Sequence, residues 1–212
     1  MGSRAVRHPV FARLYARASH AMEAEVGPHR DRLLAGLSGA VLEVGAGNGL
    51  NFAHYPTGVT RVLAVEPEPY LRNLAREAAA RAPCPVDVAD GVAERLPADD
   101  GTFDAAVASL VLCSVHDPEA AMSELYRVVR PGGELRFYEH VRAESPRLRR
   151  VQRTLDATVW PRFTGGCHAH RDTVTAITRA GFSIDRLDGV RVPDTRISVP
   201  TSPHVIGSAT HP

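Results

Sequence analysis

The residues with the clearest chemical potential are three glycines spaced two positions apart. Gly45, Gly47 and Gly49 directly follow the apolar run 41–44, whose one charged member is Glu43. Glycine allows positive φ and lets a ligand approach the backbone where a Cβ would clash. A helix that starts after this turn would direct free N–H groups and its positive dipole end at the ligand. The stretch therefore predicts a pocket for a nucleotide-type cofactor.

The glycine spacing discriminates between nucleotide cofactors. The dinucleotide fingerprint G-x-G-x-x-G needs glycine at position 50, which is Leu50, so a nicotinamide-dependent oxidoreductase is disfavoured. The P-loop pattern needs G-K-[S/T], and the chain contains no lysine. An acidic residue followed by G-x-G-x-G resembles the cofactor loop of class I S-adenosylmethionine-dependent methyltransferases. A tight strand–helix turn in another α/β protein is the alternative.

A second acidic residue ends the next apolar run. Glu66 follows the run 62–65 and lies 17 residues after Gly49, close to the ~20-residue spacing of a ribose-binding acid. Its carboxylate could accept hydrogen bonds from both ribose hydroxyls. Glu68 is expected to be a solvated acid at a helix start, where it complements the helix dipole. The same capping role is the alternative for Glu66.

Length and composition limit the possible classes of protein. A chain of 212 residues fits one domain, divided into an N-terminal helical lid (1–38), a cofactor-binding core (39–140) and a substrate-side insertion with the C-terminal strands (141–212). The net charge of +1 is too small to attract nucleic acid or an anionic membrane by long-range electrostatics. No apolar stretch reaches the ~18–20 residues of a membrane span, and no signal peptide is visible. We expect a cytoplasmic protein.

The cysteines and histidines give no metal motif along the chain. Cys84, Cys113 and Cys167 have neither C-x-x-C spacing nor an even number, so they predict no disulfide framework and no zinc site. His168 and His170 form a pair, but no third ligand lies at helical spacing. We therefore expect no metal.

Apolar periodicity predicts alternating strands and helices. The predicted strands are 40–45, 61–66, 85–89, 103–110, 134–139, 182–190 and 203–210. The predicted helices are 9–36 with a break at Gly27-Pro28, 49–55, 68–81, 117–129 capped by Asp117, 145–163, and a last one capped by Asp172. Such alternation implies a parallel sheet with helices on both faces and a ligand at the carboxyl ends of the strands.

Three segments resemble one family, the type 11 class I methyltransferases: residues 41–49, 104–115 and 124–133. The last, E-L-Y-R-V-V-R-P-G-G, is the most specific. Further pieces, including 110–115, 139–141, 166–167 and 203–207, are similar to the branch that contains animal alkyl-thiol S-methyltransferases. The resemblance covers about residues 11–210. It implies an α/β, Rossmann-like, seven-stranded, mostly parallel sheet with an antiparallel last strand, N-terminal helices and a helical insertion before the last helix.

The family pattern also implies roles for individual residues, with S-adenosyl-L-methionine as cofactor. The implied cofactor contacts are Glu43, Gly45, Ala46, Gly47, Asn48, Gly49, Asn51, Glu66, Pro67, Val92, Ala93, Ser109 and Leu110. The expected acceptor-side residues are Tyr15, Ser114, His116, Trp160, Cys167, His170, Arg171 and His204. Relatives often place a carboxylate where this chain has Val92, so Asp90 or a water would have to meet the adenine. The thiol enzymes carry an N-terminal membrane anchor, whereas this chain begins almost at its first helix, so we expect no membrane partner.

The predicted chemistry is an in-line displacement of a methyl group from a sulfonium. The protein mainly aligns the acceptor and excludes water. A free thiol has a pKa of about 8.5, which a nearby imidazole could lower. His140 follows Glu139, and the two could form a carboxylate-oriented base; local packing of His140 is the alternative.

The sequence thus predicts transfer of a methyl group to a small-molecule thiol, such as a secondary metabolite. Alternatives are N-, O- or C-methylation by the same family, or a non-catalytic cofactor-binding protein. Nucleic-acid methylation is disfavoured because the chain has no [N/D]-P-P-[Y/F] tetrad and no basic surface.

Overall fold

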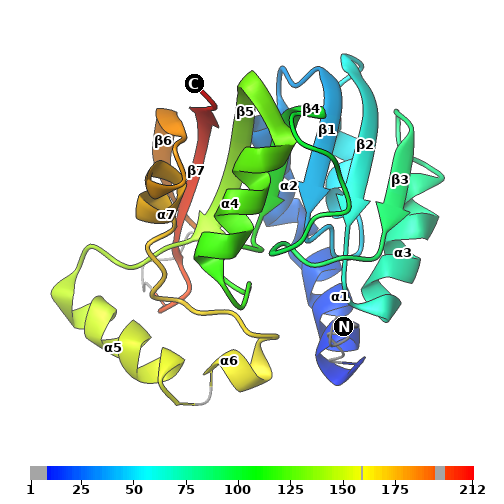
Figure 1. Ribbon diagram of the computed structural model, residues 1–212. Coiled ribbons are helices and arrows are strands. Elements are labelled where there is room, and N and C mark those ends of the chain that lie inside the picture. Colours follow the sequence, from blue (N-terminus) through cyan, green and yellow to red (C-terminus); the bar gives the residue numbers. More distant parts are fainter. Residues whose placement is uncertain (1–8, 159, 194–198) are drawn as a thin grey trace.

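Seven strands form one mixed sheet in the computed structural model, which describes residues 9–158, 160–193 and 199–212 (Figure 1). The strand order is β3-β2-β1-β4-β5-β7-β6. β7 pairs antiparallel with β5 and with β6, and the other pairings are parallel. The strands are β1 (Gly39–Val44), β2 (Val59–Val65), β3 (Val86–Ala89), β4 (Phe103–Ser109), β5 (Val129–His140), β6 (Ser183–Arg191) and β7 (Pro203–Thr210). The predicted fold class is confirmed.

The helices agree with the prediction except at the N-terminal end and in the insertion before the last helix. They are α1 (Pro9–Ala21), α2 (Glu23–Leu34), η1 (Leu50–His54), α3 (Pro69–Ala79), α4 (Pro118–Val128), α5 (Pro146–Asp156), α6 (Trp160–Phe163) and α7 (Thr173–Arg179). The predicted break at Gly27-Pro28 is wrong, because the break lies at Met22 and Pro28 is inside α2. An internal proline costs ~3 kcal/mol. Buried Leu33 and Leu34 anchor α2 on the sheet and offset that cost.

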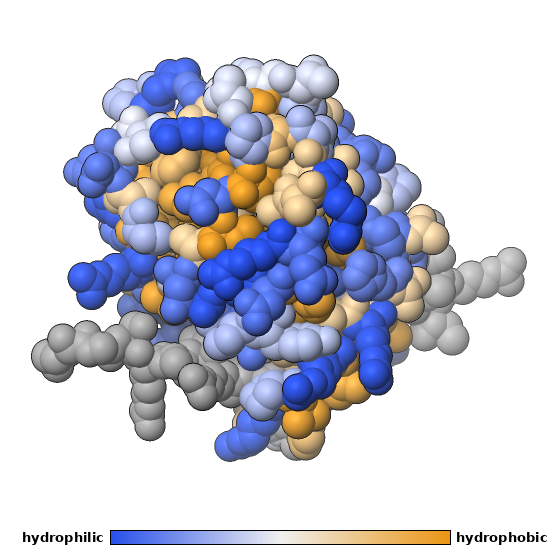
Figure 2. All heavy atoms as spheres, turned by 90° about the vertical axis from the view of Figure 1, so that its right-hand side faces the viewer, coloured by the Kyte–Doolittle hydropathy of each residue, from blue (hydrophilic) through white to orange (hydrophobic). Residues whose placement is uncertain are grey.

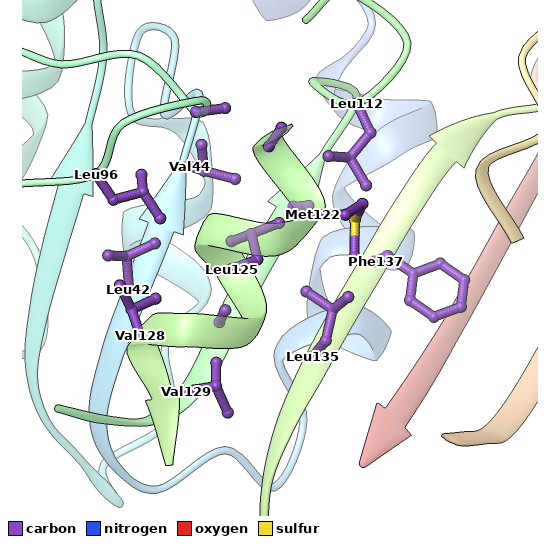
Figure 3. Close-up of a cluster of buried hydrophobic side chains, with 14 of the residues drawn as sticks. Leu42, Val44, Leu96, Leu112, Met122, Leu125, Val128, Val129, Leu135 and Phe137 are labelled. Carbon is purple, nitrogen blue, oxygen red and sulfur yellow. The ribbon is translucent and has the colours of Figure 1, made fainter. Parts of the chain in front are cut away.

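Each face of the sheet carries its own hydrophobic core. On one face, Leu42, Leu135 and Phe137 pack against Met122 and Leu125 of α4 (Figure 3). On the other face, strand residues pack against α2, α3 and η1. Because successive strand residues point to opposite faces, neighbours such as Val41 and Leu42 enter different cores. Because both faces of the sheet are covered, a ligand site is expected in the loops at the carboxyl ends of the parallel strands.

Three helices gather at these strand ends. α1, α5 and α6 lie at the end of the sheet where the parallel strands finish (Figure 1). Ala12 and Ala16 of α1 pack on Leu71 of α3, so the N-terminal segment is joined to the core. The insertion predicted as one helix over 145–163 forms two, α5 and α6.

The helix caps follow the sequence prediction in two of three cases. Asp117 accepts hydrogen bonds from the amides of Glu119 and Ala120, and Asp172 accepts one from Thr175. Glu68 caps α3 through the Leu71 amide, but it is buried rather than solvated as predicted.

A hollow lies beside β3, the edge strand of the sheet, away from the carboxyl ends of the strands. Figure 2 shows this side, where apolar residues gather among charged ones. A hollow of about 370 Å³ lies between the end of α3 and the start of β3. Within the described residues, no helix combines the length and the apolar composition needed to cross a bilayer.

Candidate functional site

The three glycines of the loop after β1 all have positive φ, at 66°, 58° and 78°. A Cβ on Gly45 would lie 2.2 Å from Val111, and one on Gly49 would lie 2.8 Å from the Phe52 ring. Packing of the protein itself therefore requires two of the glycines. A Cβ on Gly47 would instead meet the ring of Tyr15 at 3.3 Å, so Gly47 faces the N-terminal helix predicted to act as a lid.

Glu66 joins the end of β2 to the glycine loop. Its Oε2 accepts a hydrogen bond from the Gly47 amide at 2.8 Å, and its Oε1 accepts one from the Glu68 amide at 2.8 Å. The side chain is 5 % exposed, and burial raises the pKa of Glu66 while the two amides oppose that rise. The structure thus places the predicted ribose-binding acid beside the glycine loop; its contact with ribose stays a prediction.

Glu43 and Asn51 belong to a buried network beneath the loop. Glu43 accepts hydrogen bonds from the Tyr55 hydroxyl at 2.6 Å and from Asn51 Nδ2 at 2.9 Å. Arg30 of α2 donates to Asn51 Oδ1 at 2.6 Å. Burial raises the pKa of Glu43 to about 7. Glu43 and Asn51, both predicted to contact the cofactor, therefore hold η1 and α2 against β1. Arg30 belongs to the same network, although no feature of the sequence indicated it.

The other predicted cofactor residues line the same edge. Asn48 donates to Ser19 Oγ of α1 at 3.1 Å, whereas Ala46 and Ala93 are buried in the two cores. Leu110 has a φ of 56°, a strained conformation for a residue with a side chain. Its amide donates to the carbonyl of Tyr138 in β5 at 2.7 Å. The turn after β4 is thus fixed to β5.

Four further positions bear on the predicted contacts with the adenine and the rest of the cofactor. Pro67 and Val92 are half-buried, and Val92 pairs with Arg95 in an isolated bridge. Asp90, the expected substitute for the missing carboxylate, accepts a hydrogen bond from Arg72 at 2.9 Å. Ser109 ends β4 with a buried Oγ that has no hydrogen-bond partner.

Glu139 binds backbone amides rather than an imidazole. Its Oε1 accepts from the amides of Val111 at 3.0 Å and Leu112 at 2.9 Å, and its Oε2 accepts from the amide of Cys113 at 3.2 Å. Burial raises the pKa of Glu139 to about 7. The predicted carboxylate-oriented base is therefore not the arrangement found. Successive residues of a strand point to opposite faces of the sheet. Glu139 therefore binds the loop after β4, while the His140 side chain points to the other face.

His140 lies instead beside two cysteines. Its Nδ1 is 3.6 Å from Cys167 Sγ, and the ligand atoms of Cys113, His140 and Cys167 all lie within 4.8 Å of one another. We call these three residues the sulfur–imidazole group. The Cys113 thiol and His140 lower the pKa of Cys167 to about 5, whereas donation to Cys167 and burial raise the pKa of Cys113. The pKa values of the two cysteines are therefore shifted in opposite directions.

Several predicted acceptor-side residues surround this group. Ser114 Oγ is 3.5 Å from Cys113 Sγ, and Trp160 contributes to the lowered pKa of Cys167. The His204 ring lies 4.3 Å from the His140 ring, and its Nδ1–H donates to the carbonyl of Ser202. Burial lowers the pKa of His204 to about 3, so His204 is neutral at physiological pH.

Arg171 brings positive charge to the same place. Its Nη2 donates to the Val115 carbonyl at 2.6 Å, and its Nη1 is buried without a partner. Burial lowers the pKa of Arg171, although the nearby cysteines and Glu139 oppose that shift. A cavity of about 220 Å³ with a largely apolar lining begins at Leu112 and Arg171 and continues between α4 and α7.

Tyr15 faces the glycine loop at Gly47. Burial raises its pKa, and Glu66 and Cys113 are both close enough to raise it further. Two predicted residues are not part of this arrangement. His116 is exposed, with its amide bound to Glu94, and the amide of His170 is bound to Asp156.

Comparison with known proteins gives the family. Residues 42–137 match the model of a methyltransferase domain. The chain is 35 % identical over 182 residues to thiol S-methyltransferase TMT1B of Homo sapiens, covering 83 % of this chain and 73 % of that protein. It is 36 % identical over 181 residues to thiol S-methyltransferase TMT1A of Homo sapiens, covering 82 % and 72 %. This chain belongs to the S-adenosylmethionine-dependent methyltransferases.

The fold of this methyltransferase agrees with solved structures. An S-adenosylmethionine-dependent methyltransferase from Mesorhizobium loti superposes with a TM-score of 0.65 over 87 % of this chain and 97 % of that chain, at 19 % identity. At that identity the likeness concerns the fold alone. The chain is an enzyme that methylates a small molecule, and its cofactor is S-adenosylmethionine.

The residues at the strand ends fit this cofactor. The glycine loop lies beside the buried carboxylate of Glu66, which accepts a hydrogen bond from the Gly47 amide, and Ser109 adds a buried hydroxyl without a partner. S-adenosylmethionine, when bound, supplies a methyl group activated by a positively charged sulfur. The protein's own task is therefore to hold the acceptor in line, to exclude water and to remove the acceptor's proton.

Proposed function

We propose that this methyltransferase transfers the methyl group to a thiol of a small organic molecule, and that the sulfur–imidazole group receives that thiol. The names of the two human relatives support a thiol acceptor. The observation that carries the proposal is the position of Cys113, His140 and Cys167. They come from the loop after β4, the end of β5 and the loop after α6, and Tyr15, which faces the glycine loop, lies close enough to Cys113 to feel its charge.

The site offers a means of deprotonating a thiol. A free thiol has a pKa of about 8.5 and is mostly protonated at neutral pH. The Cys113 thiol and the His140 imidazole lie close together, and hydrogen bonds from such groups would favour the thiolate form of an acceptor bound beside them. His140 assists this deprotonation, and the nearby positive charge of Arg171 would favour the thiolate.

The neighbouring cavity suits the rest of the acceptor. Leu112, Met122 and Ala176 give the cavity an apolar lining. Arg171 also lines it, and its Nη1 is buried without a hydrogen-bond partner. An organic thiol with an apolar body would bury that body here, at about 25 cal/mol per Å² of apolar surface. A polar substituent could bind Arg171.

The proposal is tested by replacing His140. His140→Ala should lower kcat/KM for a thiol by about 10²–10⁴ at neutral pH. The rate should recover at high pH, where the thiol ionises unaided, and cofactor affinity should be unchanged. His116→Ala is the matched control, because His116 is exposed and outside the group. Wild-type rates of His140→Ala at pH 7 would remove His140 from the mechanism.

The acceptor class is tested with a panel of thiols, amines and phenols. The proposal expects turnover of thiols, with a rate that rises with pH as thiolate accumulates. Turnover of amines or phenols without thiols would make the chain an N- or O-methyltransferase. Tight binding of S-adenosylmethionine without turnover of any acceptor would favour a non-catalytic cofactor-binding protein.

A further inference from the structure

The sulfur–imidazole group has the composition of a metal site. Two sulfur atoms and one imidazole nitrogen, from the loop after β4, the end of β5 and the loop after α6, lie within 4.8 Å of one another. Thiolate and imidazole are the ligands that zinc prefers. Because the three residues come from separate segments, it is the tertiary fold that brings these donors together.

The observed spacing suits a tetrahedral ion. With Zn–S of about 2.3 Å and Zn–N of about 2.0–2.1 Å, two tetrahedral ligands S and N lie about 3.6 Å apart. The distance from Cys167 Sγ to His140 Nδ1 is 3.6 Å. Cys113 Sγ lies within the 4.8 Å limit of both atoms. An ion could therefore bind with small side-chain movements.

The burial of the group also suits a bound ion. Cys113 and Cys167 would bind it as thiolates, since metal binding releases protons from its ligands. Both cysteines are buried, at 1 % and 7 % exposure, so water competes little for the ion.

The ligands are held by neighbouring groups, as metal ligands usually are. Glu139 fixes the backbone of Cys113 through the Cys113 amide and the two amides before it. The His204 ring packs on the His140 ring. The Cys167 amide donates to the carbonyl of Thr164, which fixes the third ligand.

We infer that Cys113, His140 and Cys167 bind a zinc ion through Sγ, Nδ1 and Sγ and leave its fourth position open. Two cysteines and one histidine with an open position is the ligand set of a catalytic rather than a structural zinc. An acceptor thiol would lose its proton to solvent and bind there as thiolate. That use of the fourth position rests on the proposed function, whereas binding of the ion does not. His140 would then assist deprotonation as a ligand, since Nδ1 on the ion accepts no proton.

The test measures metal content directly. Untagged protein, kept reduced, is incubated with Zn²⁺, desalted and assayed for zinc by mass spectrometry. Wild type should retain about one ion per chain, and Cys113→Ser, Cys167→Ser and His140→Ala should each retain less than about a tenth of that amount. Cys84→Ser is the matched control, because Cys84 is a buried cysteine away from the group, and it should retain one ion.

Cobalt provides a second readout that needs no variant. Co²⁺-loaded wild type should show thiolate-to-cobalt charge-transfer absorption and the intense visible bands of tetrahedral cobalt. Binding of S-adenosylhomocysteine to each variant checks that it is folded. The inference is overturned if wild type retains no zinc and gives no such spectrum. Zinc that is retained equally in all three ligand variants also overturns it, because the ion would then lie elsewhere.

The two proposals fail separately. Thiol methylation by a protein that binds no zinc would overturn the metal site and leave the proposed function intact. A bound ion with turnover of amines or phenols alone would overturn the thiol acceptor and leave the metal site intact.

Discussion

Glu139→Gln tests whether Glu139 positions a loop or serves as the charged partner of His140. Glutamine keeps an oxygen for the amides of Val111 and Leu112, and it loses only the longest bond, to Cys113 at 3.2 Å. Alanine would leave three buried amides without an acceptor at ~1–3 kcal/mol each. That sum approaches the total stability of a domain, about 5–15 kcal/mol. Glutamine is therefore the informative change.

The pH dependence of stability follows from the raised pKa. Burial raises the pKa of Glu139 from 4.5 to about 7 in the folded protein. The folded state therefore holds this proton more tightly, and the resulting stability is fully present below pH 4.5 and lost as the pH rises to about 7. At 1.36 kcal/mol per unit this amounts to about 3 kcal/mol. Glutamine does not titrate, so wild type should lose up to that amount relative to the variant over this range.

Urea unfolding of both proteins at several pH values measures this difference. Glu43 also has a pKa raised to about 7, but it is present in both proteins and cancels in the comparison. If Glu139 positions the loop, the variant should keep kcat within about tenfold of wild type. Loss of a charged partner from a catalytic imidazole costs about 10⁴ in serine proteases. A stability gap that widens in favour of wild type as the pH rises, or a 10⁴-fold loss of kcat, would refute the reasoning.

Two further predictions concern the cofactor loop. Glu66→Ala should weaken S-adenosylmethionine binding by about 1.5–3 kcal/mol in calorimetry, because charge-assisted hydrogen bonds are lost; Gly47→Val should weaken it more, since its side chain enters the space between the loop and Tyr15. Unchanged affinity in both folded variants would remove this loop as the cofactor site. Gly45→Ala should destabilise the protein by about 1–3 kcal/mol in urea unfolding, because its Cβ would lie 2.2 Å from Val111 at a φ of 66°. Adding Val111→Ala should recover part of that loss, and a single variant as stable as wild type would contradict the packing argument.

The fold was largely predictable because its signals are local. Apolar runs, the acidic caps of α4 and α7 and strict alternation of strands and helices determine the layers. The helix break was predicted at Gly27-Pro28 because local propensity disfavours both residues. The prediction failed because burial of Val26 and Leu33, which lie far along the chain from the strands they contact, keeps α2 intact.

The site could be predicted only where its residues lie close together in the sequence. Gly45 to Gly49 and Glu66 are recognised from spacing within two consecutive strands. Cys167 and His140 lie 27 residues apart, so no linear motif relates them. Strand register brings His140 opposite His204, and the insertion with α5 and α6 brings Cys167 to the end of β5. Glu139 was misassigned because adjacency in sequence is not adjacency of side chains in a strand.

The central claim is that the acceptor atom is sulfur, and a matched pair of acceptors tests it most directly. A thiol and the alcohol with the same carbon skeleton are offered together with S-adenosylmethionine that carries a trideuterated methyl group. Mass spectrometry of the products then reports which atom received the label. The account predicts a labelled thioether, less of it with His140→Ala at neutral pH, and no labelled ether. A labelled ether without thioether would contradict the claim.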